Sequence, residues 1–141
     1  MLDRAIEFAT EAHEGQVRKY TGEPYIMHPM AVMRIVEGVP GHTQEMLVAA
    51  VLHDVVEDTD VTLSDIKSEF GDQVARLVSY LTDISVPEDG NRLKRKRKDA
   101  QWYAQGPAEA QTIKVADFID NTWDIAQNAP KFWEVYKMEK M

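Results

Sequence analysis

Apolar residues recur at helical spacing along almost the whole chain, and this period constrains the fold more than any other feature of the sequence. Leu2, Ile6 and Ala9 lie on one face of a helix that we expect to run to about Glu14 and to end at Gly15. No pair of alternating segments indicates a β-hairpin, and the sequence contains no internal repeat and no low-complexity linker. The pattern therefore predicts an all-α fold.

Capping residues and helix breakers divide the rest of the chain. Thr43 can cap a helix that continues to about Glu57, and Thr62 with Asp65 resembles the capping box of a helix that reaches Phe70. Gly and Pro positions delimit the other expected helices, which cover about 28–37, 72–81, 91–105 and 108–128, with a last one after Pro130.

Length and composition suit one domain, residues 1–141. A chain of 141 residues can form one sizeable core, and the absence of cysteine excludes disulfides and thiolate metal sites. No apolar run approaches the roughly 18 residues of a membrane helix, and the N-terminus does not resemble a signal peptide. We therefore expect a cytoplasmic protein (in the host cytoplasm if a phage encodes it) without a membrane partner.

Charge is unevenly distributed along the chain. The net charge of −8, from 16 Lys and Arg against 24 Asp and Glu, disfavours a nucleic-acid partner. Six basic residues nevertheless fall into seven positions: Arg92, Lys94, Arg95, Lys96, Arg97 and Lys98. Such a block is usually a solvated helix face, and the alternative is a surface that contacts an anionic ligand.

Residues 52–59 concentrate groups that can bind a metal ion. His53 and Glu57 are four residues apart on one helical face, and Asp54 and Asp58 repeat this spacing on the neighbouring face. Polar groups that emerge from an apolar helix are costly to bury unpaired, and a divalent cation would offset that cost. The alternative is an acidic helix end that is solvated.

Two other segments carry candidate site residues. Lys114, Asp117 and Asn121 are three and four residues apart on another expected helix, and the apolar neighbours of Asp117 favour its partial burial. The alternative for Asp117 is a surface residue or a cap. His28 opens a helix and could point into a cleft, although a lone histidine is more often structural.

Three fragments, in this order, resemble the HD superfamily of metal phosphohydrolases. They are Arg-Lys-x-Thr-Gly-Glu-Pro-Tyr-x-x-His-Pro from Arg18, His-Asp-x-x-Glu-Asp-Thr from His53, and Lys-x-Ala-Asp-x-x-x-Asn from Lys114. Within the superfamily the chain is similar to the (p)ppGpp hydrolases, namely the Rel/Spo hydrolase domain and the stand-alone small alarmone hydrolases. The resemblance covers residues 3–125 and implies a single compact HD-domain helical bundle that holds one Mn²⁺, with Fe, Co or Zn as alternatives.

The resemblance also implies residue roles. The implied metal ligands are His28, His53, Asp54 and Asp117, and the implied catalytic pair, which positions and activates the attacking water, is Glu57 and Asp58. The implied substrate-binding residues are Arg18, Lys19, Arg95, Lys96, Arg97, Lys114 and Asn121. Arg18 could stack on a purine face, and the basic block could supply the counter-charge for phosphates.

The expected activity is Mn²⁺-dependent hydrolysis of the 3′-pyrophosphate of ppGpp or pppGpp, an alarmone of the stringent response, to GDP or GTP and pyrophosphate. One alternative keeps the site but changes the substrate to an adenine alarmone, the 2′-phosphate of NADPH or a dNTP. Another is a non-catalytic nucleotide- or protein-binding module on the same scaffold. The expected partner is a purine nucleotide polyphosphate, and self-association into a homo-oligomer is left open.

The chain also departs from the family pattern. Residues 91–106 are more basic than expected, and Ile119-Asp120 replaces a more typical apolar or His-containing pair. Asp120 and Thr122 could therefore change the base or sugar pocket. Relatives usually carry further helices after the Asn121 segment, so four apolar residues near the end are expected either in the core or on a partner surface: Phe132, Trp133, Tyr136 and Met138.

Overall fold

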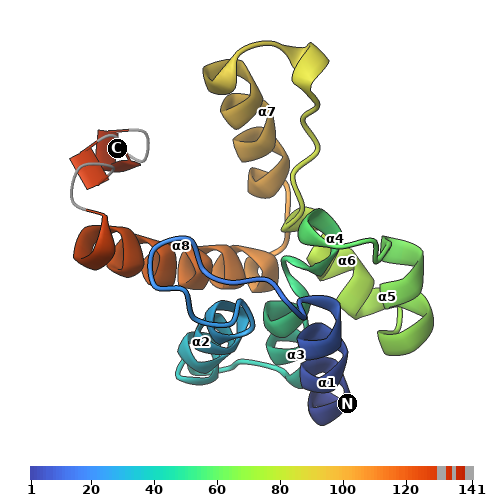
Figure 1. Ribbon diagram of the computed structural model, residues 1–141. Coiled ribbons are helices and arrows are strands. Elements are labelled where there is room, and N and C mark those ends of the chain that lie inside the picture. Colours follow the sequence, from blue (N-terminus) through green and yellow to red (C-terminus); the bar gives the residue numbers. More distant parts are fainter. Residues whose placement is uncertain (130–132, 135, 139–141) are drawn as a thin grey trace.

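Helices form the regular secondary structure of the described residues (Figure 1). The computed structural model describes residues 1–129, 133, 134 and 136–138. Within them lie α1 (Leu2–Ala12), α2 (Met27–Glu37), α3 (Gln44–Leu52), α4 (Val55–Asp58), α5 (Leu63–Phe70), α6 (Asp72–Tyr80), a short 3₁₀ helix η1 (Pro87–Asp89), α7 (Arg92–Ala104) and α8 (Ala108–Asn128). No strand occurs among these residues, so the all-α prediction is confirmed.

The centre of the bundle is α3. All of its residues from Met46 to Leu52 are buried, as expected for a helix that is apolar on every face. Helices α1, α2, α6 and α8 pack against it. His53, the residue that follows α3, therefore lies in the centre of the bundle, where it is 2% exposed.

Both predicted capping threonines occupy their expected places. The Thr43 hydroxyl accepts a hydrogen bond from the Met46 amide at 3.2 Å. Thr62 and Asp65 form a reciprocal box, in which each side chain accepts from the other's backbone N–H at 3.2 and 3.0 Å. These bonds satisfy N–H groups that a helix start leaves without a partner.

The prediction of a single helix from Thr43 to about Glu57 is wrong, because the helix is interrupted between α3 and α4. The imidazole Nδ1 of His53 donates to the Ala50 carbonyl at 2.6 Å, and the His53 amide also approaches this oxygen at 3.4 Å. A continuous helix would give that carbonyl to the Asp54 amide. The histidine side chain thus competes with the helix ladder at the point where it ends.

Helix α7 stands away from the bundle, above α8 (Figure 1). Its anchor is Asp99, which is 7% exposed and accepts from the amides of Ile84 and Ser85, both at 2.9 Å. Farther along, Trp102 stacks on Tyr80 with ring centroids 4.6 Å apart. The carboxyl-terminal half of α7 is therefore fixed to the preceding segments, while the basic block occupies its projecting amino-terminal half.

Part of the expected last helix lies outside the described residues, including Phe132 and Val135. Tyr136 is described, and its ring stacks on Phe118 of α8 with centroids 6.2 Å apart. Its hydroxyl lies 3.5 Å from that of Thr122.

Candidate active site

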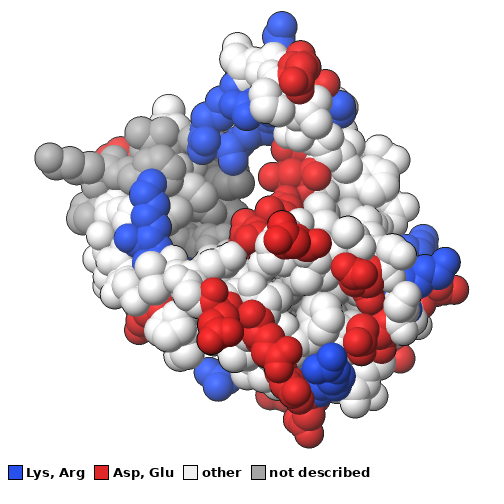
Figure 2. All heavy atoms as spheres, turned by 45° about the vertical axis from the view of Figure 1, so that its right-hand side comes forward, with Lys and Arg blue, Asp and Glu red and all other residues white. Residues whose placement is uncertain are grey.

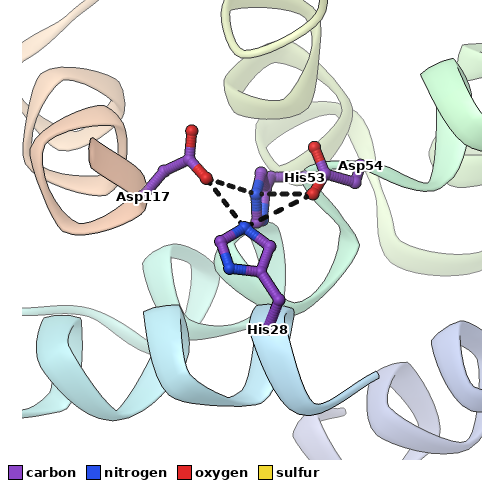
Figure 3. Close-up of side chains that lie close together, drawn as sticks. All are labelled: His28, His53, Asp54 and Asp117. Atoms are coloured by element: carbon purple, nitrogen blue, oxygen red, sulfur yellow. Dashed lines mark hydrogen bonds and ion pairs between the residues drawn. The ribbon is translucent and has the colours of Figure 1, made fainter. Parts of the chain in front are cut away.

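Two histidines and two aspartates converge between α2, the α3–α4 junction and α8 (Figure 3). His28 Nε2 lies 2.8 Å from Asp117 Oδ1 and 3.6 Å from Asp54 Oδ2. His53 Nε2 lies 3.0 Å from Asp54 Oδ2 and 3.2 Å from Asp117 Oδ1. One donor atom from each residue falls within 4.8 Å of all the others. The structure therefore brings together the four residues expected as metal ligands.

The second ring nitrogen of each histidine is also bonded. His53 Nδ1 contacts the Ala50 carbonyl at 2.6 Å, and His28 Nδ1 contacts Asp120 Oδ2 at 2.7 Å. Both partners are acceptors, so in a neutral ring the proton sits on Nδ1 and the Nε2 lone pair faces the cluster. This arrangement is typical of histidines that bind metal ions.

The electrostatics of the cluster favour a positive charge. Burial alone would lower the pKa of His53, but the carboxylates of Asp54 and Asp117 raise it well above its usual range. For Asp117 the effects have the opposite signs. Burial alone would raise its pKa, but the facing histidines outweigh burial and lower that pKa well below normal. Two neutral histidines and two carboxylates are a suitable donor set for a divalent cation.

Tyr25 is a site residue that the sequence reasoning missed. Its hydroxyl donates to Asp54 Oδ2 at 2.6 Å, and burial followed by the charge of Asp54 raises the pKa of the phenol. Tyr25 lies one helical turn before His28, and the amide of His28 bonds the Tyr25 carbonyl at 3.0 Å. Tyr25 belongs to the fragment that carries the family resemblance, but that resemblance was not used to give it a role.

Glu57 and Asp58 lie beside the cluster, at the end of α4. The Glu57 carboxylate accepts a hydrogen bond from the Asp83 amide. Burial, with a further contribution from Asp83, raises the pKa of Glu57 to about 7. Burial and the charge of Asp54 also raise the pKa of Asp58. A carboxyl group whose pKa is near neutrality can accept a proton from water and release it again.

A pocket of about 670 Å³ opens from the cluster toward α7. Its acidic end carries Asp54, Glu57, Asp58, Asp83 and Asp117, and its other lining residues include Lys96, Lys114, Tyr103, Val115 and Phe118. Figure 2 shows Lys and Arg side chains on one side of a hollow and Asp and Glu side chains on the other. The pocket therefore presents both signs of charge to a ligand.

The residues expected to bind substrate are divided by the structure. Lys96, Lys114 and Asn121 line the pocket. Lys114 Nζ lies 3.5 Å from Asp117 Oδ2 and 4.0 Å from the centre of the Tyr103 ring, and Asn121 donates to Asp117 Oδ1 at 3.1 Å. The remaining expected residues are not among those that line the pocket: Arg18, Lys19, Arg95 and Arg97.

Comparisons with known proteins agree with this geometry. A family model described as HD domain matches residues 5–116. The chain belongs to the HD-domain family. The predicted resemblance to HD-type (p)ppGpp hydrolases is confirmed, because the HD-domain match is accompanied by relatives that carry that name.

Two curated relatives are named guanosine-3′,5′-bis(diphosphate) 3′-pyrophosphohydrolase. MESH1 of Mus musculus is 38% identical over 141 residues, which span 99% of this chain and 77% of the relative. The enzyme of Aquifex aeolicus is 41% identical over 128 residues, which span 85% of this chain and 17% of that much longer protein.

Two solved structures resemble this HD-domain protein. A metazoan orthologue of SpoT, described as hydrolysing ppGpp and acting in starvation responses, aligns with a TM-score of 0.80 and 33% identity, over 94% of this chain and 74% of its own. The protein lmo0812 of Listeria monocytogenes aligns with a TM-score of 0.63 and 38% identity, over 76% and 66%. Among the described helices, none is both long and apolar enough to cross a membrane.

Proposed function

We propose that this HD-domain protein hydrolyses the 3′-pyrophosphate of ppGpp or pppGpp with the help of Mn²⁺. The observation that carries the proposal is the cluster of His28, His53, Asp54 and Asp117 in a chain whose relatives bear the name of that activity over nearly its whole length. The pyrophosphate product and the guanine base come from those names, and the choice of Mn²⁺ comes from the family resemblance.

The reaction adds water to ppGpp and releases GDP and pyrophosphate. A divalent ion held by the cluster would lower the pKa of a water molecule and polarise a phosphoryl oxygen. Glu57 or Asp58 orients the attacking water and accepts its proton. The water oxygen bonds to the phosphorus next to O3′, the P–O3′ bond breaks, and O3′ takes up a proton.

The charges of the pocket support a polyphosphorylated substrate. The acidic end alone would repel such an anion, whereas the ammonium groups of Lys96 and Lys114 can form charge-assisted bonds with phosphate oxygens. The aromatic and apolar surface of Tyr103 and Phe118 is suited to the less polar nucleoside.

Removal of the cluster tests the proposal directly. The purified Asp54→Ala, Asp117→Ala double variant should neither bind Mn²⁺ nor release pyrophosphate from ppGpp. His42→Ala is the control, because this histidine lies outside the cluster and its Nδ1 contacts the nearby Val39 carbonyl at 2.9 Å. Full turnover by the double variant would refute the assigned site.

A substrate panel separates the proposed reaction from the alternatives. We expect pyrophosphate from ppGpp and pppGpp, measured apart from orthophosphate, with Mn²⁺ more effective than Fe²⁺, Co²⁺ or Zn²⁺. Release of orthophosphate alone would exclude the alarmone reaction and favour another phosphorylated nucleotide. Binding of ppGpp without turnover in excess Mn²⁺ would support a non-catalytic module instead.

A further inference from the structure

Behind the cluster, Asp120 connects His28 to Arg18, which lies in the loop after α1. Asp120 Oδ2 lies 2.7 Å from His28 Nδ1 and 3.0 Å from Arg18 Nη1. The second guanidinium nitrogen of Arg18 lies 3.1 Å from Asp124 Oδ2. The side chains of Arg18, Asp120 and Asp124 are only 11%, 16% and 12% exposed. These contacts are therefore largely shielded from solvent.

The geometry follows from the register of α8. Asp117, Asp120 and Asp124 are spaced three and four residues apart, so their carboxylates lie along one face of the helix. The His28 ring spans two of them, since Nε2 faces Asp117 and Nδ1 faces Asp120. The guanidinium of Arg18 spans the next pair, Asp120 and Asp124.

We propose that Asp120 and Arg18 are positioning residues of the metal centre, in which Asp120 fixes the ring of His28 and Arg18 fixes Asp120. The inference rests on cation binding at the cluster, which is part of the proposed function. A carboxylate behind a liganding histidine sets the tautomer and orientation of the ring. A guanidinium shared by two carboxylates restricts the rotamer of each.

This arrangement gives Arg18 a different task from the purine contact that the family resemblance implies. Its guanidinium is engaged by Asp120 and Asp124, and its side chain is 11% exposed. Arg18 therefore acts on the reaction through His28, and its removal should weaken metal binding in the absence of any nucleotide.

The test measures Mn²⁺ binding by calorimetry on the full, metal-stripped protein without nucleotide. Asp120→Ala should raise the dissociation constant by about 10–100-fold, the range typical of outer partners of liganding histidines. Arg18→Ala should raise it by roughly several-fold, because it acts one step farther away. Arg34→Ala, an exposed arginine on the same helix as His28, is the control and should leave the constant unchanged.

A double variant shows whether Arg18 works through Asp120. Adding Arg18→Ala to Asp120→Ala should weaken Mn²⁺ binding little further, because the link is already broken. At saturating Mn²⁺, each single variant should recover kcat with an unchanged KM. An unchanged Mn²⁺ affinity together with a raised KM in Arg18→Ala would overturn the inference and support a nucleotide contact.

Conservative variants allow the same test if Arg18→Ala does not fold. Arg18→Lys keeps the charge but can reach only one of the two carboxylates, so its Mn²⁺ affinity should lie between those of the wild-type protein and Asp120→Ala. Wild-type affinity in this variant and in Asp120→Asn would contradict the inference. Mn²⁺ binding without ppGpp hydrolysis in the wild-type protein would refute the proposed function and leave this inference intact.

Discussion

Glu57 is ionised at a higher pH than an ordinary glutamate because its carboxyl group is drawn into an acidic pocket. Burial is the largest cause, and Asp83 and Asp54 add repulsion. The amide of Asp83 and the charge of Lys114 act in the opposite direction but do not compensate. A base with this pKa is half-ionised near neutrality, which suits the proton transfer proposed for it.

The raised pKa makes Glu57 a source of pH-dependent instability in the metal-free protein. The group ionises near its ordinary 4.5 in the unfolded chain and near 7 in the folded one, so the folded state binds more protons between these values. Stability therefore falls as the pH rises through this window. Glu57→Gln in EDTA should be more stable than the wild-type protein at pH 8, by about 1 kcal/mol after allowance for solvent screening, and equally stable near pH 4.

Urea unfolding at several pH values measures this difference. Glu14→Gln is the control, because Glu14 is exposed after α1 and outside the pocket. A pH-independent difference between Glu57→Gln and the wild-type protein would contradict the assigned cause.

Sequence reasoning reached the residues of the cluster but not their supports. His28, His53, Asp54 and Asp117 stand in recognisable motifs, and their convergence follows from the family resemblance. The contact between His28 and Asp120 joins residues 92 positions apart, and the contact between Tyr25 and Asp54 joins residues 29 positions apart. Such pairs depend on how helices pack, which local spacing does not encode.

At the scale of the element, α7 divides its basic block between opposite faces. Lys96 shares the pocket face with Asp99 and Tyr103, which follow it by three and seven residues. Lys98 points elsewhere and pairs with Asp89 at 2.8 Å. The sequence alone showed the density of the charge but not the orientation of the helix.

Replacement of Lys96 should therefore affect substrate binding more than that of its neighbours. Lys96→Ala should raise the KM for ppGpp roughly tenfold, the effect of losing one charge-assisted bond, with a smaller change in kcat. Lys94→Ala removes the same charge from the opposite face of α7 and should change KM little. Equal increases in the two variants would indicate a diffuse effect of charge rather than a contact in the pocket.

The break between α3 and α4 marks the limit of helical spacing as a guide to the site. Spacing placed His53 with Glu57 and Asp54 with Asp58, on the assumption of one continuous helix. In the structure, His53 contacts both Asp54 and Asp117 within the cluster, while Glu57 accepts a hydrogen bond from the Asp83 amide. A side chain that takes a main-chain carbonyl from the helix, as His53 does at Ala50, leaves no sign in apolar periodicity.

At the scale of the whole molecule, the cluster links segments that are distant in sequence. Its four residues come from α2, the α3–α4 junction and α8, and α2 and α8 also pack against each other and against α3. A cation held there would bridge elements that enclose the core. Metal binding should therefore stabilise the folded state as a whole.

Addition of Mn²⁺ to the metal-free protein should raise its Tm. At a free concentration 100 times the dissociation constant, the gain is about 2.7 kcal/mol, or roughly 5–10 °C for a chain of this size. Asp117→Asn should abolish the shift, whereas Asp60→Asn, which replaces an exposed carboxylate outside the cluster, should preserve it. Differential scanning calorimetry with and without EDTA measures both, and a shift that survives in Asp117→Asn would place the ion elsewhere.

The all-α class and the capped helix starts could be predicted because they depend on local spacing and local hydrogen bonds, as at Thr43 and Thr62. The position of α7 could not, since it depends on Asp99 reaching the amides of Ile84 and Ser85 across a loop. The pocket lies between the bundle and α7, so its lining combines residues of α8 with residues of α7, and its shape depends on the position of α7.

The two histidines proposed as metal ligands differ in what a mutation can remove. The partner of His53 Nδ1 is the main-chain carbonyl of Ala50, which any amino acid at that position would retain. The partner of His28 Nδ1 is the side chain of Asp120, which a single replacement removes. Substitution of one residue can therefore change the orientation of the His28 ring, whereas no side-chain substitution removes the carbonyl that orients His53.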